Sequence, residues 1–414
     1  MQAGFGREEI TPPLGTELAG YGYYLERRAT HVIDPLYARA VALKEGDDTF
    51  LIVSCDCLGL SRALVRDVLN LLFRQNGIAP DHVMLVSVHT HTGPALKYHE
   101  GCGAVNPEYA QTVAPRIHAA CQNALRDLRS VVGIDYTIKR IGDEWVYNRA
   151  SNEGPVDRFA RSFHIKRDNA PLIVIASYAC HAVSRGNRDG ISADYPGEVC
   201  RIIEEDKNCR SIFLNGLCGD IDPYPPEKAG RQARLAPFAK TVAEACRADA
   251  AAQSLPRSIT GGRINIALNL MPVTKSSLTE AAEASIKANG ADGGAAKVAS
   301  IWLSEMLAKF DKLEKSEPFS VSWLRLGNIP IIALPFEGFT RTAELIREAL
   351  SDSRALTLGC AEEILGYLPT QDDIRRRAYA ALESTFLYKR LPPLPGEAER
   401  IGRLLGAMMT ETAK

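Results

Sequence analysis

The sequence has no long apolar run. None of its stretches approaches the roughly 18 consecutive apolar residues that a membrane-spanning helix needs. Its first residues, MQAGFGREEITPP, also lack the basic and then apolar regions of a secretory signal peptide. We therefore expect a cytoplasmic protein with no integral membrane association, although a leader removed before this methionine would leave no trace.

Neither sign of charge dominates the chain. It carries 49 basic and 50 acidic residues, which gives a formal net charge of -1. Such a balance provides no overall field that would attract nucleic acid or an anionic membrane surface. We predict no nucleic-acid partner and expect a small molecule that is recognised locally. The composition leaves the oligomeric state open.

Cysteines are too sparse for a disulfide scaffold, with ten in 414 residues and no CxxC pair. Several lie in apolar segments, where a thiol behaves as a small hydrophobic group. We expect most of them to be reduced core residues. The C-x-C pair of Cys55 and Cys57 is a weak candidate for metal binding.

Short apolar runs alternate with amphipathic stretches along the chain. The runs are rich in β-branched residues and lie at 49–56, 82–89, 171–181, 211–216 and 329–338. Segments such as 62–77 and 107–128 instead carry apolar residues at helical spacing. This alternation predicts an α/β fold with a mixed central sheet, helices on both of its faces and the active site at the carboxyl ends of the strands.

One segment, at about 274–317, is rich in Ala, Glu, Lys and Leu and is interrupted by NGADGG. Such a composition predicts two helices joined by a glycine-rich loop. We interpret it as a helical insertion in a single catalytic domain that spans residues 1–414, because no internal repeat or clear linker divides the chain.

Acidic or imidazole side chains follow each of the five apolar runs. They are Asp56, His89, His91, His181, Asp220, Asp222 and Glu337. In open α/β sheets, ligands bind in the crevice beyond the carboxyl ends of the strands. We therefore expect the five strands to bring these groups together at one edge of the sheet.

The stretch VSVHTHTGPAL places two histidines one residue apart at the end of an apolar run. In an extended chain this spacing puts both imidazoles on the same side. His89, His181 and Glu337 would form a His/His/Glu set, which is the ligand chemistry of catalytic zinc with an open position for water. Such a metal lowers the pKa of its bound water to about 7, so the set indicates metal-assisted hydrolysis.

Seven segments carry a family resemblance. They are GFGREEITPP, HTHTGP, YNRAS, CHAVSRGNRDGISADYPG, GLCGDIDP, LPFEGFT and GYLPTQDDIRRRAY. Together, and in this order from about residue 3 to about residue 390, they resemble the motif series of the neutral/alkaline ceramidase family. Each segment alone is weak, whereas the ordered series is specific.

The resemblance implies a zinc-dependent amidohydrolase. It implies that the metal ligands are His89, His181, Glu337 and Tyr367. It further implies that Tyr379 stabilises the oxyanion and that His91 and Arg149 line the same pocket. Asp56 and Asp194 also match aspartates of the family, and we expect them to orient ligand imidazoles. From the residues alone, both tyrosines could equally be packing residues with the phenol at the surface.

The sequence departs from the family at three places. The family's GDVSP turn, with a serine assigned to the site, is GDIDP here, so a carboxylate, Asp222, stands at that position. Asp222 could act as a general base, bind a second cation, recognise a hydroxyl or amine of the substrate, or only shape the turn. Glu337 lies in PFEG where the family has PGE, and no β-sandwich follows Tyr388. A smaller and more soluble amide than ceramide is therefore expected, although a lipid-like one fits the resemblance.

The sequence thus predicts a zinc hydrolase that cleaves a carboxamide through a metal-bound water. One alternative is a dinuclear phosphoesterase whose two cations lie about 3.5–4 Å apart. Its ligands would be His89, His91, Asp56, Asp220 and Asp222. A second alternative is a binding protein that has kept the fold and lost the chemistry.

Overall fold

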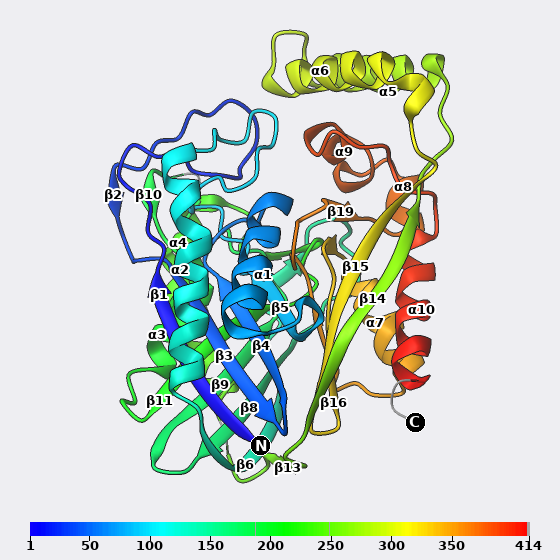
Figure 1. Cartoon of the computed structure of the whole chain (residues 1–414). Helices are drawn as coiled ribbons and strands as arrows, with labels where there is room; N and C mark the ends of the chain where they lie inside the picture. Colours follow the sequence, from blue (N-terminus) through cyan, green and yellow to red (C-terminus); the bar gives the residue numbers. More distant parts are fainter. Residues whose placement is uncertain (187, 248, 412–414) are drawn as a thin grey trace.

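Two β-sheets pack against each other in the middle of the molecule, and helices cover the outer side of each (Figure 1). The computed structural model describes residues 1–186, 188–247 and 249–411. The larger sheet has nine strands, with a parallel pair at each end and antiparallel pairs between them. Its order is β11 (Cys209–Asn215), β9 (Ala170–Tyr178), β8 (Phe159–Arg167), β6 (Arg129–Arg140), β1 (Gln2–Glu9), β3 (Tyr37–Glu45), β4 (Asp48–Cys55) and β5 (Val83–Ser87), while β13 (Gln253–Leu255) also pairs with β6.

A second, four-stranded sheet packs on the inner face of the first. Its order is β14 (Ile259–Asn269), β15 (Ser316–Leu326), β16 (Ile329–Ala333) and β18 (Leu356–Leu358). Three two-stranded ladders complete the strand pairing, and two of them carry site residues. They are β2 (His31–Val32) with β10 (Gly190–Ile191), β7 (Val146–Asn148) with β12 (Ile221–Pro223), and β17 (Glu337–Gly338) with β19 (Tyr367–Leu368).

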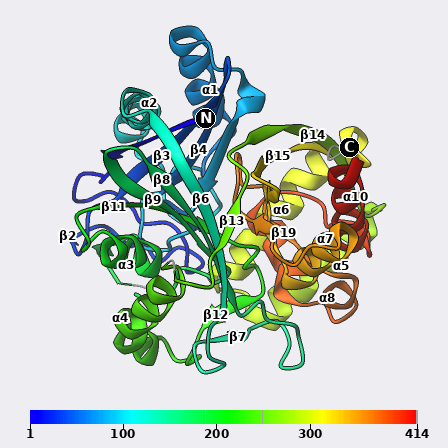
Figure 2. The same ribbon diagram turned by 90° about the horizontal axis from the view of Figure 1, so that it is seen from below.

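The helices fall into two groups, one beside each sheet (Figure 2). The larger sheet is covered by α1 (Arg62–Asn76), α2 (Pro107–Arg126), α3 (Asp194–Ile203) and α4 (Lys228–Ala245). The smaller sheet is covered by α7 (Thr340–Leu350) and α10 (Glu397–Glu411), and α5 (Lys275–Asn289), α6 (Gly294–Ala308), α8 (Gln371–Arg375) and α9 (Glu383–Leu387) lie at its end. Single 3-10 turns lie at η1 (Pro80–His82), η2 (Phe310–Lys312) and η3 (Tyr379–Ala381). Within these described parts, no helix is both long and apolar enough to cross a bilayer.

Alternation along the strands explains why this sheet can be covered on both faces. In β4, Leu51 and Val53 point to the helices, whereas Phe50 and Ile52 point to the smaller sheet. Successive side chains of a strand face opposite sides, so a strand buried on both sides is apolar throughout. The middle of β4, from Phe50 to Val53, is therefore a continuous apolar run.

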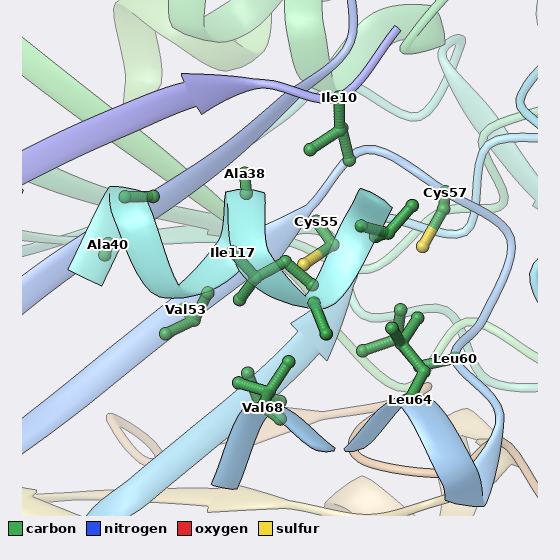
Figure 3. Close-up of a cluster of buried hydrophobic side chains, with 14 of the residues drawn as sticks. Ile10, Ala38, Ala40, Val53, Cys55, Cys57, Leu60, Leu64, Val68 and Ile117 are labelled. Carbon is green, nitrogen blue, oxygen red and sulfur yellow. The ribbon is translucent and has the colours of Figure 1, made fainter. Parts of the chain in front are cut away.

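Figure 3 shows the core between α1, α2 and the larger sheet, where Val68 of α1 and Ile117 of α2 meet Val53 of β4. Cys55 and Cys57 lie in the same apolar cluster and are free thiols. Neither belongs to a group of side chains that could hold a metal, as far as the described residues show. The structure thus gives no support to the predicted C-x-C metal candidate, because both sulfurs pack in the core.

The mixed sheet is confirmed, and its surroundings differ from the prediction. Helices cover only one face of the larger sheet, because the smaller sheet occupies the other. Four of the five predicted strands are β4, β5, β9 and β11, but the run at 329–338 gives β16 of the smaller sheet. All five residues of β16 are buried, so its composition indicates a core strand without indicating which sheet it joins.

Helices α5 and α6 form a hairpin from the segment where the composition predicts two helices (Figure 1). Thr274 caps α5 by accepting a hydrogen bond from the backbone N–H of Ser277 at 3.1 Å. The hairpin is anchored on α9, because the buried ring of Trp302 lies 4.5 Å from that of Phe386, measured between centroids. Whether it is an insertion into one catalytic domain stays a prediction.

A buried triad of charged side chains links β8 of the larger sheet to α7, which covers the smaller sheet. Asp157, just before β8, receives Arg161 of β8 at 2.8 Å and Arg347 of α7 at 2.7 Å. Burial alone would raise the pKa of Asp157, but the two guanidinium groups hold it below its usual range. Because α7 starts three residues after Glu337, the triad also fixes the segment that carries this carboxylate.

Replacing Asp157 with Asn should destabilise the fold by about 3–5 kcal/mol, because two buried arginines would lose their counter-charge. Chemical denaturation at pH 7 measures the change. The contribution of a carboxyl with a lowered pKa is present above its unfolded pKa of about 4 and is lost as the pH falls through the folded pKa. The difference in the free energy of unfolding between wild type and Asp157→Asn should therefore become smaller below about pH 4. Glu205→Gln, which breaks an exposed pair with Arg201 on α3, is the control and should have little effect.

Candidate metal centre

Three histidines from two strand ends meet in one place. Ligand nitrogens of His89, His91 and His181 all lie within 4.8 Å of one another. His89 and His91 follow β5, and His181 follows β9. His89 and His181 are fully buried, whereas His91 is partly exposed. Three imidazoles at this separation could hold a metal ion.

The local backbone brings His89 and His91 together in a way that the period of a strand does not predict. Strand β5 ends at Ser87, and His89 has a left-handed backbone with φ of 65°. Its N–H donates to the Cys57 carbonyl at 3.0 Å, and the N–H of His91 donates to the Ala182 carbonyl at 3.2 Å. The extended-chain argument was therefore wrong, since the imidazoles converge through a turn. A non-glycine residue in this conformation costs about 1–2 kcal/mol and is typical of functional sites.

Backbone carbonyls set the tautomers of two of these histidines. Nδ1 of His89 lies 2.7 Å from the Leu58 carbonyl oxygen, and Nδ1 of His181 lies 2.6 Å from that of Cys218. A carbonyl only accepts, so each Nδ1 carries the proton and each Nε2 presents a lone pair to the site. Nothing in the described chain bonds to either ring nitrogen of His91. His89 and His181 are thus oriented as ligands, and His91 is not.

Glu337 brings a carboxylate to the same two nitrogens. Its Oε2 lies 3.2 Å from His89 Nε2 and 3.1 Å from His181 Nε2. Burial and the adjacent Arg149 lower the pKa of His181, which favours the neutral ring. When both rings are neutral, two lone pairs and a carboxylate oxygen face one another with no proton between them, which is unfavourable unless a cation lies among them. The donor set of two nitrogens and one oxygen fits zinc.

The amide of Asn215, the last residue of β11, holds the two histidine loops in place. Its side-chain N–H donates to the Val88 carbonyl at 3.0 Å, and its oxygen accepts from the Cys180 N–H at 3.4 Å. These groups immediately precede His89 and His181 in the chain. A fully buried amide that satisfies both loops fixes the distance between the two imidazoles.

Tyr367 and Arg149 lie beside the carboxylate. Glu337 and Tyr367 are paired residues of the β17–β19 ladder, and their side chains are hydrogen bonded. Arg149 Nη2 donates to the Tyr367 hydroxyl at 2.8 Å and lies 3.2 Å from His181 Nε2. The structure therefore brings the predicted ligand Tyr367 and the predicted pocket residue Arg149 to the histidines.

Asp222 lies next to Arg149 and away from the histidine group. The β7–β12 ladder brings the two together, with Asp222 Oδ1 3.4 Å from Arg149 Nη1. Its other oxygen pairs with Arg231 Nη2 at 3.0 Å. A carboxylate paired with two guanidinium groups is suited to fixing the position of Arg149.

Tyr379 reaches the site from η3, and its ring centroid lies 5.9 Å from that of Tyr367. The residue is 44% exposed, and its hydroxyl is hydrogen bonded to Tyr23. Tyr379 thus lines the cavity beside the histidines with part of its side chain exposed.

The other predicted carboxylates serve the backbone. Asp56 accepts from the backbone N–H of Tyr37 at 2.9 Å, Asp194 from that of Arg185 at 2.7 Å, and Asp220 from that of Thr340 at 2.9 Å. No bond from Asp56 or Asp194 to a ligand imidazole occurs in the described residues, so their predicted orienting role has no support. Among those residues, the three histidines are also the only group of His, Cys, Asp or Glu side chains that could hold a metal ion, which gives no support to a second cation site.

The sequence analysis missed further residues of the site. Tyr388 donates to Glu337 Oε1 at 2.5 Å, and His99, Cys102 and Tyr21 line the same cavity. Tyr388 lies near the end of the chain in no recognisable pattern. His99 offers one signal, since it follows HTHTGP in the same loop.

Known proteins were compared with the chain at the level of sequence and of fold. No protein-family model and no curated protein matches the sequence. The crystal structure of neutral ceramidase from Pseudomonas aeruginosa matches with a TM-score of 0.73 at 15% identity, covering 99% of this chain and 74% of the other. A ceramidase complexed with C2 matches with a TM-score of 0.75 at 14% identity, covering 99% and 75%. At this identity the likeness concerns the fold, so the chain has the fold of about three quarters of neutral ceramidase.

Proposed function

We propose that this protein is a zinc-dependent amidohydrolase that cleaves an N-acyl bond. The observation that carries the proposal is the position of Glu337 Oε2, which lies 3.2 Å from His89 Nε2 and 3.1 Å from His181 Nε2. Two imidazole nitrogens and a carboxylate oxygen that face one another in this way can hold a cation between them. The ceramidase fold supports amide cleavage as the reaction class.

The metal would be held by His89, His181, Glu337 and Tyr367. A zinc ion there would supply a water of lowered pKa and a Lewis acid for the amide carbonyl. Tyr388 and Arg149 hold the two oxygen ligands in place through their bonds to Glu337 and Tyr367. The loop carbonyls of Leu58 and Cys218 do the same for the imidazoles.

The remaining residues have separable roles. His91 takes up the proton from the attacking water at a ring nitrogen and returns it to the leaving amine, because its neutral ring has no other partner in the described chain. Tyr379 donates its hydroxyl hydrogen to the carbonyl oxygen as negative charge develops there. Asp222 holds Arg149 between itself and Tyr367.

Elemental analysis of protein purified without chelator tests the proposal first. We expect one zinc per chain in the wild type, none in His181→Ala, and an unchanged content in the exposed-site control His31→Ala. A purified chain without metal would remove the mechanism, and two ions per chain would favour the dinuclear phosphoesterase. Bound zinc without turnover on a panel of amides would favour a binding protein.

Removing the Asn215 amide should weaken zinc binding without removing any ligand. Asn215→Ala leaves the Val88 carbonyl and the Cys180 N–H unpaired, so we expect a loss of about 10- to 100-fold in zinc affinity. Competition with a chelating dye measures it. Asn208→Ala, on an exposed turn, is the control, and equal affinities in the two variants would contradict the assigned role of Asn215.

The hydroxyl of Tyr379 should matter for turnover and not for metal content. Tyr379→Phe should lower kcat about 100-fold or more, which is typical of a lost oxyanion donor, and should retain its zinc. Tyr224→Phe, at an equally exposed tyrosine of another loop, should keep the wild-type rate. Near-normal turnover of Tyr379→Phe would show that Tyr379 is not the oxyanion donor.

A further inference from the structure

The proposed oxyanion donor Tyr379 is hydrogen bonded to a second tyrosine. Its partner is the hydroxyl of Tyr23. Tyr23 lies in the loop between β1 and β2, whereas Tyr379 lies in η3 near the other end of the chain. The proposed mechanism gives Tyr23 no role, although it bonds to a group that would contact the substrate.

Both of these phenols keep their hydrogens at neutral pH. Desolvation raises the pKa of Tyr23 to about 12. It also raises the pKa of Tyr379 well above its usual value, and the neighbouring Tyr23 and Tyr367 add to that rise. A neutral hydroxyl has one hydrogen to donate and two lone pairs that can accept. The pair therefore holds two hydrogens, and only one of them lies between the two oxygens.

The direction of this hydrogen bond decides what Tyr379 can do. If Tyr379 donated to Tyr23, its single hydrogen would be used within the pair and none would be left for a substrate oxygen. If Tyr23 donates instead, the hydrogen of Tyr379 is available to another acceptor. Tyr379 lines the cavity beside the histidines, and its ring centroid lies 5.9 Å from that of Tyr367. An oxyanion donor at this position therefore needs Tyr23 as its own donor.

The α5–α6 hairpin packs directly against Tyr23. The backbone of α6 comes so close that a Cβ atom at Gly294 would lie 2.8 Å from the Cβ of Tyr23. Lys297 of the same helix places its Nζ 4.0 Å from the ring centroid of Tyr24. On the other side, the N–H of Tyr24 donates to the Gly101 carbonyl at 2.6 Å. The segment that carries Tyr23 is thus fixed from two directions.

The same hairpin also contacts the segment that follows Tyr379 (Figure 1). Asn289, the last residue of α5, donates to the Glu383 carboxylate at the start of α9 at 3.0 Å. The ring of Trp302 in α6 packs on that of Phe386 in α9. The hairpin therefore sets the two tyrosines relative to each other, although they come from opposite ends of the chain.

We propose that Tyr23 is a positioning residue that donates a hydrogen bond to Tyr379 and thereby directs the hydrogen of the Tyr379 hydroxyl at the substrate oxygen. A hydroxyl that accepts a hydrogen bond is also a stronger donor, because hydrogen bonds in a chain polarise one another. The role of Tyr379 as oxyanion donor rests on the proposed function, whereas the contact between the two hydroxyls rests on the structure.

Acetate binding tests this role without turnover. Acetate accepts hydrogen bonds, and it is the acid that hydrolysis of any N-acetyl amide would release. Ligand-observed NMR on the protein as purified should show acetate binding about 10-fold more weakly to Tyr379→Phe and about 3- to 10-fold more weakly to Tyr23→Phe. In the Tyr379→Phe background, Tyr23→Phe should change the affinity by less than about twofold, because Tyr23 acts only through Tyr379.

Zinc content should be the same in the wild type and in all of these variants. Unchanged acetate binding in Tyr23→Phe, or an equal loss in both backgrounds, would overturn the proposal. A wild type that binds no acetate would do the same, because no acceptor would then reach Tyr379.

The next residue in the loop offers a matched control. Tyr24 donates its hydroxyl hydrogen to Glu100 at 2.8 Å, outside the tyrosine pair. Tyr24→Phe removes one hydroxyl and keeps the ring and the backbone hydrogen bond, so acetate affinity should stay within about twofold of the wild type. A loss as large as that in Tyr23→Phe would assign the effect to the loop as a whole and would overturn the role of Tyr23.

Turnover separates this role from the proposed function. With the amide of the panel that the wild type hydrolyses fastest, Tyr23→Phe should lower kcat about 10-fold and change KM by less than about twofold, because charge on the carbonyl oxygen develops only in the transition state. Coupled losses of acetate binding without hydrolysis of any amide would reject the amidohydrolase and keep the role of Tyr23. Hydrolysis with independent losses would do the reverse.

Discussion

The buried amide of Asn215 is the contact on which the arrangement of the site depends. It lies at the end of β11 and bonds to the backbone just before His89 and just before His181. The two imidazoles belong to loops after different strands, so their separation is set by whatever joins those loops. Side chains of the ligands cannot do this themselves, because each has only one nitrogen left to offer. A satisfied buried amide is geometrically strict, since each of its groups must meet a partner in a fixed direction.

Charge compensation explains the arrangement of Arg149, Asp222 and Arg231 beside the histidines. Arg149 lies beside a potential metal ligand with its side chain 27% exposed, and an acidic neighbour compensates its charge. Asp222 is this neighbour, and Arg231 in turn balances the carboxylate from the other side. The chain of charges ends at the Tyr367 hydroxyl, which Arg149 holds next to Glu337. The two arginines thus give the carboxylate at position 222 a structural reason, and its predicted catalytic role stays a prediction.

Much of this arrangement could be predicted from the sequence, and the failures have physical causes. The apolar runs predicted β4, β5, β9 and β11, because strands buried on both faces are apolar throughout. The same composition could not separate β16 into another sheet, since pairing is a long-range property. The resemblance pointed to Tyr367, Arg149 and Glu337, which the structure brings together. Tyr388 could not be found, because its partner Glu337 is 51 residues away in the chain and no local pattern marks it.

The position of Glu337 after a strand of the smaller sheet has a consequence for the free energy of unfolding. The histidines belong to loops of the larger sheet, whereas Glu337 and Tyr367 follow strands of the smaller one. An ion bound by the histidines and by Glu337 and Tyr367 together would link the two sheets directly. Such an ion binds the folded chain and not the unfolded one, so its occupancy adds to the free energy of unfolding. The resistance of this protein to heat and proteolysis would then rise and fall with the free zinc concentration around it.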